Sequence, residues 1–205
     1  KNRKGLMLVL SSPSGAGKTS ICKEILKKTK ELELSISYTT RPKRKSEVDG
    51  RDYFFISEKK FKELLANDFF IENAKVFEHL YGTPKNFVEK NLLKGVDVLF
   101  DIDWQGAQKL SNFSKTDIVS VFILPPSNSI LKERLKKRNE DSLETVNKRM
   151  SKAKSEMSHW IEYDYVLINE DLVTCTNEVV TILKAERKKR DRQKFIFTFI
   201  EKLLN

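Results

Sequence analysis

One short loop near the start of the chain carries residues that could bind and transfer a phosphate group. Residues 12–19 read Ser-Pro-Ser-Gly-Ala-Gly-Lys-Thr, and they follow a short apolar run at residues 6–10. Glycines let the backbone approach an anion, so that successive N–H groups and the start of a following helix face phosphate oxygens. In such a loop Lys18 reaches the transferable phosphate, and the Thr19 hydroxyl holds Mg²⁺. The pattern predicts a phosphate-binding loop.

The first position of this loop departs from the strict motif, because Ser12 stands where the motif has glycine. The alternative interpretation is an ordinary strand-to-helix turn that Ser14 caps. Gly17, Lys18 and Thr19 come directly after an apolar strand, and this combination seldom arises by chance. The sequence therefore favours the phosphate-binding loop.

Two aspartates follow a second apolar run, at residues 96–100. Asp101 and Asp103 share a face if the strand continues, because side chains alternate along a strand. In phosphate-loop enzymes an aspartate at this place holds Mg²⁺ directly or through water. The alternative is a pair of aspartates that form a turn or cap a helix. Together with Lys18 and Thr19, Asp101 predicts a magnesium site.

Two arginines, Arg41 and Arg44, flank Pro42 after a segment that we expect to form a strand. A pair of guanidinium groups in this arrangement can bind a phosphate dianion through paired hydrogen bonds. The alternative is a pair of surface arginines on a turn. Both interpretations remain open from these residues alone.

The elements that position these residues alternate between strand and helix. Apolar or β-branched runs without strict alternation predict buried parallel strands at residues 6–10, 96–100, 119–124 and 165–168. Helical spacing predicts helices at residues 18–30, 127–138, 143–160 and 175–190. This order predicts an α/β fold with a doubly wound parallel sheet, whose ligand lies at the carboxyl ends of the strands.

Residues 34–94 do not fit this alternation. They hold a turn at Asp49-Gly50, a predicted strand at residues 53–56, and a short helical pattern at Phe61, Leu64 and Leu65. We expect an inserted substrate-binding lobe with its own strands, between the first and second core strands. A second charged segment, residues 134–149, spans the junction of two helices and predicts a mobile lid.

Composition narrows the class of protein. The chain has 205 residues and a formal net charge of +10, but its lysines are scattered, which disfavours a nucleic-acid partner. No apolar stretch approaches the roughly 20 residues that span a membrane. The two cysteines match no metal or redox spacing and predict reduced thiols of a cytoplasmic protein. The apolar tail at residues 195–204 predicts a docked C-terminal helix rather than a membrane anchor.

From about Lys4 to the C-terminus, the chain resembles the guanylate kinase family, whose members phosphorylate GMP to GDP with ATP. The resemblance depends on several motifs in the family's order. They read Ser-Pro-Ser-Gly-Ala-Gly-Lys-Thr at 12–19, Ser-Ile-Ser-Tyr-Thr-Thr-Arg at 35–41, Glu-Val-Asp-Gly at 47–50, Asp-Tyr-Phe-Phe at 52–55, Phe-Ile-Glu at 70–72, Tyr-Gly-Thr at 81–83, Asp-Ile-Asp-Trp-Gln-Gly at 101–106, Phe-Ile-Leu-Pro-Pro at 122–126, Met-Ser-His-Trp at 157–160 and Glu-Tyr-Asp-Tyr at 162–165.

The resemblance implies a role for each matching residue. The implied ATP-binding residues are Ser12, Pro13, Ser14, Gly15, Ala16, Gly17, Lys18 and Thr19, and the implied metal ligands are Thr19 and Asp101. The implied GMP-binding residues are Arg41, Arg44, Tyr53 and Tyr81 for the phosphate, and Ser37, Glu72, Thr83 and Asp103 around the guanine. The implied catalytic residues are Lys18, Arg134, Arg138 and Arg149, whose charges stabilise the migrating phosphoryl group.

The chain departs from the family's pattern at two further places. Leu80 stands where relatives commonly have a tyrosine before Tyr81, and Lys137-Arg138-Asn139 replaces a common Gly-Arg-Gly in the lid. The second change is expected to stiffen the lid without removing Arg138.

These observations together predict a cytoplasmic, Mg²⁺-dependent enzyme that transfers a phosphoryl group from ATP to GMP, and to dGMP. The expected single domain has a core at residues 1–34, 95–126 and 160–205, a GMP-binding lobe at about 35–94 and a lid at about 127–159. Whether it is a monomer or a homo-oligomer is left open. Three alternatives are a binding module that has lost catalysis, a nucleic-acid-binding protein and a kinase for another nucleoside monophosphate.

Overall fold

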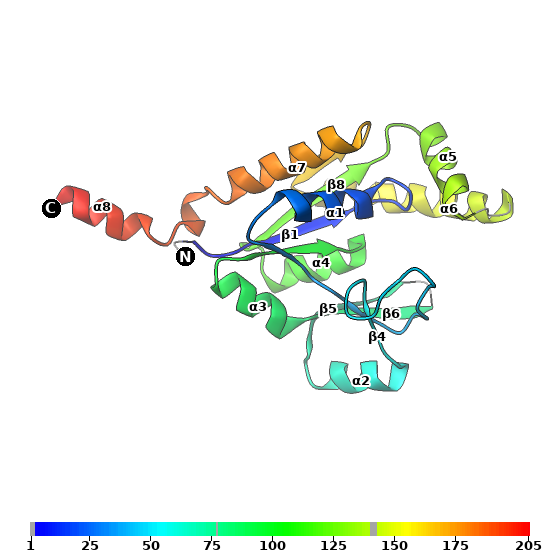
Figure 1. Ribbon diagram of the computed structural model, residues 1–205, viewed down its shortest axis with the longest axis horizontal. Coiled ribbons are helices and arrows are strands. Elements are labelled where there is room, and N and C mark those ends of the chain that lie inside the picture. The colour runs from blue at the N-terminus through cyan, green and yellow to red at the C-terminus, as the bar shows by residue number, and fades with distance from the viewer. Residues whose placement is uncertain (1–2, 77, 140–142) are drawn as a thin grey trace.

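Two β-sheets organise the chain, which this computed structural model describes over residues 3–76, 78–139 and 143–205 (Figure 1). The larger sheet has five parallel strands in the order β2-β7-β1-β8-β9. Their bounds are β1 Met7–Ser11, β2 Leu32–Leu34, β7 Asp97–Asp101, β8 Ile118–Leu124 and β9 Tyr165–Ile168. Helices cover both faces of this sheet, so the predicted α/β class and doubly wound parallel sheet are confirmed.

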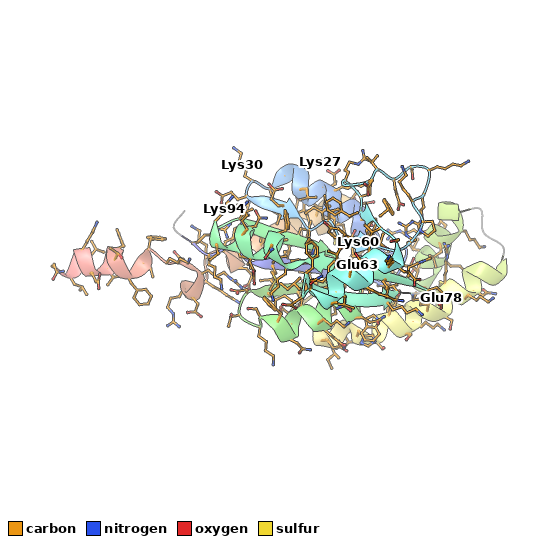
Figure 2. All side chains as sticks on the ribbon, turned by 90° about the horizontal axis from the view of Figure 1, so that it is seen from below. Lys27, Lys30, Lys60, Glu63, Glu78 and Lys94 are labelled. Carbon is orange, nitrogen blue, oxygen red and sulfur yellow. The ribbon has the colours of Figure 1, made fainter. Side chains whose placement is uncertain are left out.

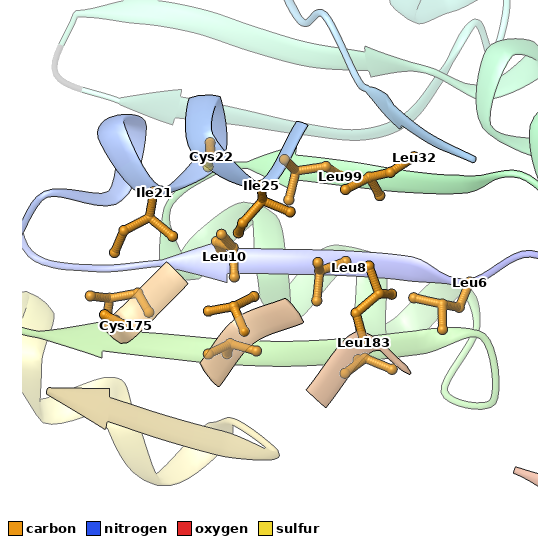
Figure 3. Close-up of a cluster of buried hydrophobic side chains, with 14 residues drawn as sticks. Leu6, Leu8, Leu10, Ile21, Cys22, Ile25, Leu32, Leu99, Cys175 and Leu183 are labelled. Carbon is orange, nitrogen blue, oxygen red and sulfur yellow. The ribbon is translucent and has the colours of Figure 1, made fainter. Parts of the chain in front are cut away.

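Alternating side chains of the central strand build the two halves of the core. Leu8 and Leu10 lie on one face of β1, where they pack with α1 (Lys18–Lys28) and α7 (Leu172–Glu186) (Figure 3). Met7 and Val9 lie on the other face, where they pack with α3 (Lys85–Leu93) and α4 (Trp104–Phe113). All four side chains are fully buried. Burial on both faces explains why the strand reads as one continuous apolar run.

The carboxyl ends of the parallel strands form one edge of the sheet, and two predicted motifs leave it there. The phosphate loop follows β1, and Asp101 ends β7, opposite Leu10 of β1 in the register. After β1, the next two strands in the chain, β2 and β7, lie on one side of β1, and the last two, β8 and β9, lie on the other. The order therefore reverses between β1 and β8, which is where doubly wound sheets bind their ligands.

The predicted elements agree with the structure to within a few residues, but three elements that pack in the core were not predicted. All four predicted core strands are present, together with the unpredicted strand β2, and α3 and α4 are unpredicted helices. Because β2 belongs to the large sheet, the insertion follows the second core strand in the chain rather than the first. The expectation that the insertion lies between the first and second core strands is wrong in this respect.

The insertion forms the second sheet, of four strands in the order β4-β3-β6-β5. Their bounds are β3 Tyr38–Thr39, β4 Phe54–Phe55, β5 Phe70–Val76 and β6 His79–Pro84, and α2 spans Glu58–Ala66. Aromatic stacking holds the small sheet together: the Tyr38 and Phe54 rings lie 4.6 Å apart, as do those of Phe61 and Phe70. In Figure 1 this sheet and α2 lie below the large sheet.

Two further helices, α5 (Asn128–Asn139) and α6 (Leu143–Met157), lie at one end of the molecule (Figure 1). They pack on each other through a small apolar cluster of Leu131, Leu135 and Ala153, all fully buried. A short 3₁₀ helix, Ser158–Glu162, follows α6 and leads to β9. The side chain of Arg138, and those of Lys137 and Asn139 beside it, lie outside the described residues.

The C-terminal helix α8 (Ile196–Leu204) corrects a prediction. The predicted helix forms, but it is not docked: none of its residues is buried, and Phe197 and Leu204 are 73% and 81% exposed. Figure 1 shows α8 projecting from the body, at the opposite end from α5 and α6. Helical spacing of apolar residues predicts an apolar face, but it says nothing of the surface that this face would need as a partner.

Charged side chains are spread over the surface rather than gathered on one element. Figure 2 labels Lys27, Lys30, Lys60, Glu63, Glu78 and Lys94, which come from α1 and α2, from the segments that follow α1 and α3, and from the turn between β5 and β6. Several of the lysines pair with nearby carboxylates, such as Lys27 with Glu24 at 2.6 Å and Lys60 with Glu63 at 3.3 Å. Within the described ranges, no helix combines the length and the apolar character that crossing a bilayer requires.

Candidate active site

The phosphate loop owes its path to two glycines with positive φ. Gly15 has φ +91° and Gly17 has φ +98°, a backbone region that other residues rarely adopt. A side chain at Gly17 would approach the Asn169 amide nitrogen to 2.4 Å, and one at Gly15 would lie 3.0 Å from Leu131. Gly17 is also the N-cap of α1. The loop therefore leads directly into a helix N-terminus, the arrangement that favours an anion.

Lys18 and Thr19 meet Asp101 at the edge of the sheet. The Lys18 ammonium lies 2.5 Å from Asp101 Oδ1 and donates to the Ile102 carbonyl at 2.9 Å, and Thr19 Oγ1 lies 3.2 Å from Asp101 Oδ2. Burial opposes the charged form of Lys18, but the Asp101 carboxylate outweighs burial and raises the pKa of Lys18. Lys18 is therefore held as a cation beside a carboxylate and a hydroxyl.

A buried carboxylate from the small sheet lies on the same cavity. Glu72 is only 5% exposed, and its Oε1 accepts a hydrogen bond from Thr83 Oγ1 at 2.7 Å. The Ser37 hydroxyl lies 3.5 Å from the same Thr83 oxygen. Burial raises the pKa of Glu72 to about 7, the nearby charge of Asp103 adds to the rise, and the Thr83 hydrogen bond opposes it. Glu72 is a carboxylate that two hydrogen-bond donors of a ligand would stabilise in its ionised form.

Arg41 is held among aromatic rings and a carboxylate. Its guanidinium donates to Glu47 at 2.6 Å and lies over the Tyr53 ring at 5.4 Å. Tyr53 and Tyr81 contact each other edge to face, with ring centroids 5.9 Å apart. The backbone N–H of Arg44 donates to the same Glu47 at 2.8 Å, but the Arg44 side chain is 65% exposed. Glu47 thus fixes the turn that carries both arginines.

Asp103 does not lie on a continued strand. The strand β7 ends at Asp101, and Asp103 is the N-cap of α4, where its Oδ1 accepts from the Gly106 N–H at 3.1 Å. The alternative interpretation of a capping aspartate therefore holds for Asp103. It still lines the cavity beside Glu72, because α4 begins at the same edge of the sheet.

One cavity of about 770 Å³ brings most of the predicted residues together. Its lining joins the phosphate loop and the end of β7 to the small sheet. The predicted residues on it are Ser12, Pro13, Ser14, Gly15, Gly17, Lys18, Thr19, Ser37, Tyr53, Glu72, Tyr81, Asp101, Asp103 and Arg134. Ala16, Arg41, Arg44, Thr83 and Arg149 are not among the described lining residues, although Ala16, Arg41 and Thr83 contact residues that are.

Two of the three predicted arginines of α5 and α6, Arg134 and Arg149, have side chains that the structure describes. Arg134 lines the cavity, and its guanidinium lies 3.5 Å from the Ala16 carbonyl and 3.3 Å from the Asn169 carbonyl. Arg149 is half-buried on α6 and is not among the lining residues. Of the two predicted arginines whose side chains the structure describes, Arg134 thus lies at the phosphate loop.

Among the cavity residues that sequence reasoning missed, three contact the phosphate loop or Glu72. Asn169 donates to the Ala16 carbonyl at 2.7 Å, and Glu156 of α6 accepts from the Ser14 N–H at 3.1 Å. A side chain at Gly106 would lie 3.2 Å from Glu72 Oε2, so Gly106 lets α4 approach that carboxylate. Only Gly106 left a signal, because it ends the motif that starts at Asp101.

Comparisons with known proteins agree with this geometry. The family model described as guanylate kinase matches residues 4–186. A guanylate kinase of Bradyrhizobium diazoefficiens is 52% identical over 98% of this chain and 92% of its own length. One of Zymomonas mobilis is also 52% identical, over 98% of this chain and 94% of its own length.

A solved structure extends the likeness to the fold. The crystal structure of guanylate kinase from Anaplasma phagocytophilum superposes with a TM-score of 0.83 and 37% identity, covering 98% of this chain and 96% of that one. The match therefore includes the large sheet, the inserted sheet and the helices α5 and α6. The chain belongs to the guanylate kinase family of enzymes.

Proposed function

We propose that this enzyme transfers the terminal phosphoryl group of ATP to GMP and to dGMP, giving ADP and GDP or dGDP. One observation carries the proposal: a buried carboxylate, Glu72, and a phosphate loop line the same cavity. A buried carboxylate can select guanine through its two adjacent donors, and a phosphate loop can bind a triphosphate. The family assignment supports ATP and GMP as the substrates.

Guanine selection is assigned to Glu72, with Ser37, Thr83 and Asp103 around it. Guanine presents two adjacent donors, N1–H and the N2 amine, and a carboxylate presents two acceptors. Adenine has an acceptor at N1 and no N2 amine, so it would leave Glu72 unpaired in a buried place, at a large cost in free energy. These contacts address the base and not the ribose 2′-hydroxyl, which supports dGMP as a second acceptor.

The GMP phosphate is assigned to Arg41, Arg44, Tyr53 and Tyr81. Arg41 already lies over Tyr53 and shares the carboxylate Glu47 with the backbone of Arg44. A phosphate dianion offers several acceptor oxygens to such guanidinium and hydroxyl donors. Binding at this cluster would direct the GMP phosphate toward the phosphate loop across the cavity.

The ATP phosphates are assigned to the loop Ser12–Thr19, and the phosphoryl transfer to the charges around it. An oxygen of the GMP phosphate attacks the terminal phosphorus of ATP, and the bond from that phosphorus to the bridging oxygen breaks, releasing ADP. The attacking phosphate is already ionised, so no general base is needed. Lys18 and Arg134, with Arg138 and Arg149 as further candidates, would stabilise the transferring group by charge and position.

Magnesium fits the residues at the edge of the sheet. Mg²⁺ prefers one or two protein oxygens, with phosphates and water as its other ligands. The Thr19 hydroxyl and the Asp101 carboxylate, 3.2 Å apart, supply such oxygens. The described residues include no group of three or more His, Cys, Asp or Glu side chains able to hold a metal by themselves. When bound there with ATP, the ion would neutralise charge on the phosphates.

Three parts are proposed to divide this work. The core comprises residues 1–34, 95–126 and 160–205, the GMP-binding lobe residues 35–94, and the lid residues 127–159. The second sheet supports the lobe, and the apolar contact between α5 and α6 supports the lid. The buried free thiols of Cys22 and Cys175 support a cytoplasmic location, and the paired, scattered surface charges favour small-molecule partners over nucleic acid.

The test is the release of ADP from Mg²⁺-ATP with each nucleoside monophosphate supplied in turn. We expect rapid turnover with GMP and dGMP only. Turnover with AMP, UMP or CMP at a similar rate would identify a kinase of different specificity. An inactive protein that still binds GMP would indicate a binding module instead.

A further inference from the structure

The carboxylate of Glu156 lies on the phosphate loop. Its Oε2 accepts a hydrogen bond from the backbone N–H of Ser14 at 3.1 Å, and its side chain is only 14% exposed. Glu156 lines the same cavity as Lys18 and Arg134. Backbone N–H groups of such loops are the donors that phosphate oxygens use. An anionic side chain of the protein therefore already accepts a hydrogen bond from a backbone N–H of the phosphate loop.

The packing of α5 and α6 on the loop sets this contact. The position of a Cβ at Gly15 lies 3.0 Å from Leu131 and 3.1 Å from Leu135, so the loop backbone touches the apolar side of α5. These two leucines pack with Ala153 of α6, three residues before Glu156. The position of the carboxylate is thus coupled to the seating of both helices on the loop.

The end of α6 disfavours the Glu156 carboxylate, whereas two direct contacts and the cations on the same cavity wall favour it. Glu156 is in the last turn of α6, where the negative end of the helix dipole disfavours a carboxylate. The Lys152 ammonium lies 3.6 Å from its other oxygen, Oε1, and Ser14 supplies the N–H. A triphosphate in the loop would add several negative charges to the same cavity. Repulsion between them and Glu156 follows directly.

We propose that Glu156 competes with the phosphate oxygens of ATP for the Ser14 N–H. Binding of the triphosphate then displaces the carboxylate, and with it the end of α6, from the loop. Glu156 is a positioning residue that lowers the affinity for ATP and couples ATP binding to the position of α6. This inference depends on the proposed role of the loop in binding ATP.

The test compares the wild-type protein with Glu156→Gln, which removes the charge and keeps the shape, and with Glu156→Ala, which also removes the acceptor. Asp191→Asn is the matched control, because it removes one negative charge from a side chain that is 82% exposed at the far end of the molecule. Calorimetry measures the binding of Mg²⁺-ATP and of tripolyphosphate, a probe without a base. Steady-state kinetics give KM for ATP and for GMP.

We expect both Glu156 variants to bind ATP and tripolyphosphate about tenfold more tightly than the wild type, the order for losing a charge-assisted hydrogen bond at a partly exposed place. KM for ATP falls in parallel, and KM for GMP stays within about twofold. For Glu156→Gln the gain shrinks as salt is added, because the repulsion is screened. A purely structural role for Glu156 would give no such salt dependence. Asp191→Asn binds as the wild type does.

Equal or weaker binding of ATP and tripolyphosphate by both Glu156 variants, in a wild-type protein that phosphorylates GMP, overturns this inference and leaves the proposed function intact. A wild-type protein that binds neither ATP nor tripolyphosphate instead contradicts the proposed function of the loop. The two failures are therefore distinguishable by the wild-type measurements alone.

Discussion

Replacing Glu72 by glutamine should make the protein more stable at neutral and alkaline pH. The carboxyl is buried, and its one described hydrogen-bond donor is the Thr83 hydroxyl. Glutamine keeps an oxygen at the same place for Thr83, has the same size and carries no charge. The substitution therefore isolates the free-energy cost of holding an ionised carboxylate in the cavity wall without a ligand.

The size of the effect follows from the pKa of Glu72, which burial raises from its ordinary 4.5 to about 7. Each pKa unit corresponds to about 1.4 kcal/mol, so full ionisation of Glu72 costs the folded protein roughly 3 kcal/mol. Because folding raises the pKa of Glu72, the protonated carboxyl favours the folded state. Its contribution to the free energy of unfolding is fully present below pH 4.5 and is lost as the pH rises to about 7. A total stability of about 5–15 kcal/mol makes such a loss easy to measure.

The assay is urea unfolding of the wild type and of Glu72→Gln, without nucleotide, from pH 5 to pH 8.5. We expect the free energy of unfolding of the variant, relative to the wild type, to rise by about 2–3 kcal/mol across this range and to level off above pH 7. All other titrating groups are shared and cancel in the difference. Glu63→Gln is the control and should show no such trend, because this side chain is 48% exposed on α2, the helix that packs against the same sheet.

A constant difference between Glu72→Gln and the wild type across the pH range would refute this reasoning. It would mean that Glu72 ionises in the folded protein at its ordinary pKa, through water or donors that reach it. The proposed selection of guanine by a desolvated carboxylate would then lose its physical basis. In that case the ratio of kcat/KM for GMP to that for AMP should also survive the substitution.

Three further predictions concern the phosphate loop, the arginine pair and the C-terminal helix. Lys18→Ala should lower kcat by about 10²–10³-fold with the fold intact. The control Lys27→Ala, which removes an exposed lysine of α1, should not lower kcat. Near wild-type turnover in a folded Lys18→Ala protein would contradict the assigned role. Arg44→Met should raise KM for GMP much more than KM for ATP, and a parallel rise in both would place the arginine outside the GMP phosphate site. A chain ending at Lys194 lacks α8, in which no residue is buried. Its Tm should change by no more than about 4 °C, and its kcat should not change. A larger fall in Tm would show that α8 packs on the body.

The sequence by itself determined the features that depend on neighbouring residues. The phosphate loop is one, because Gly15 and Gly17 must adopt backbone angles that other residues avoid, and Lys18 must follow them. The apolar run of β1 is another, since burial on both faces selects apolar residues at every position. The helix α4 also left a local signal, the capping Asp103 with Ala107 and Leu110 at helical spacing, which the expectation of a longer strand obscured.

The resemblance to a family supplied the residues of the GMP side, and the structure brought five of them, Ser37, Tyr53, Glu72, Tyr81 and Asp103, to one cavity. Glu72 and Lys18 are distant in the sequence, and periodicity alone gives no reason to pair them. They meet because the inserted sheet lies beside the carboxyl ends of the core strands. The three-residue strand β2 is too short to be distinguished by its pattern, and its pairing with β7 defines it.

Only the tertiary structure decided which surfaces meet. Glu156 and Ser14 are 142 residues apart, and their hydrogen bond exists because α6 is seated on the loop. The apolar face of α8 was readable from the sequence, but no surface among the residues that the structure describes buries it. A residue's own neighbours fix its backbone preference and the face on which it lies. What covers that face depends on the free energy of packing whole elements against one another, which no local pattern contains.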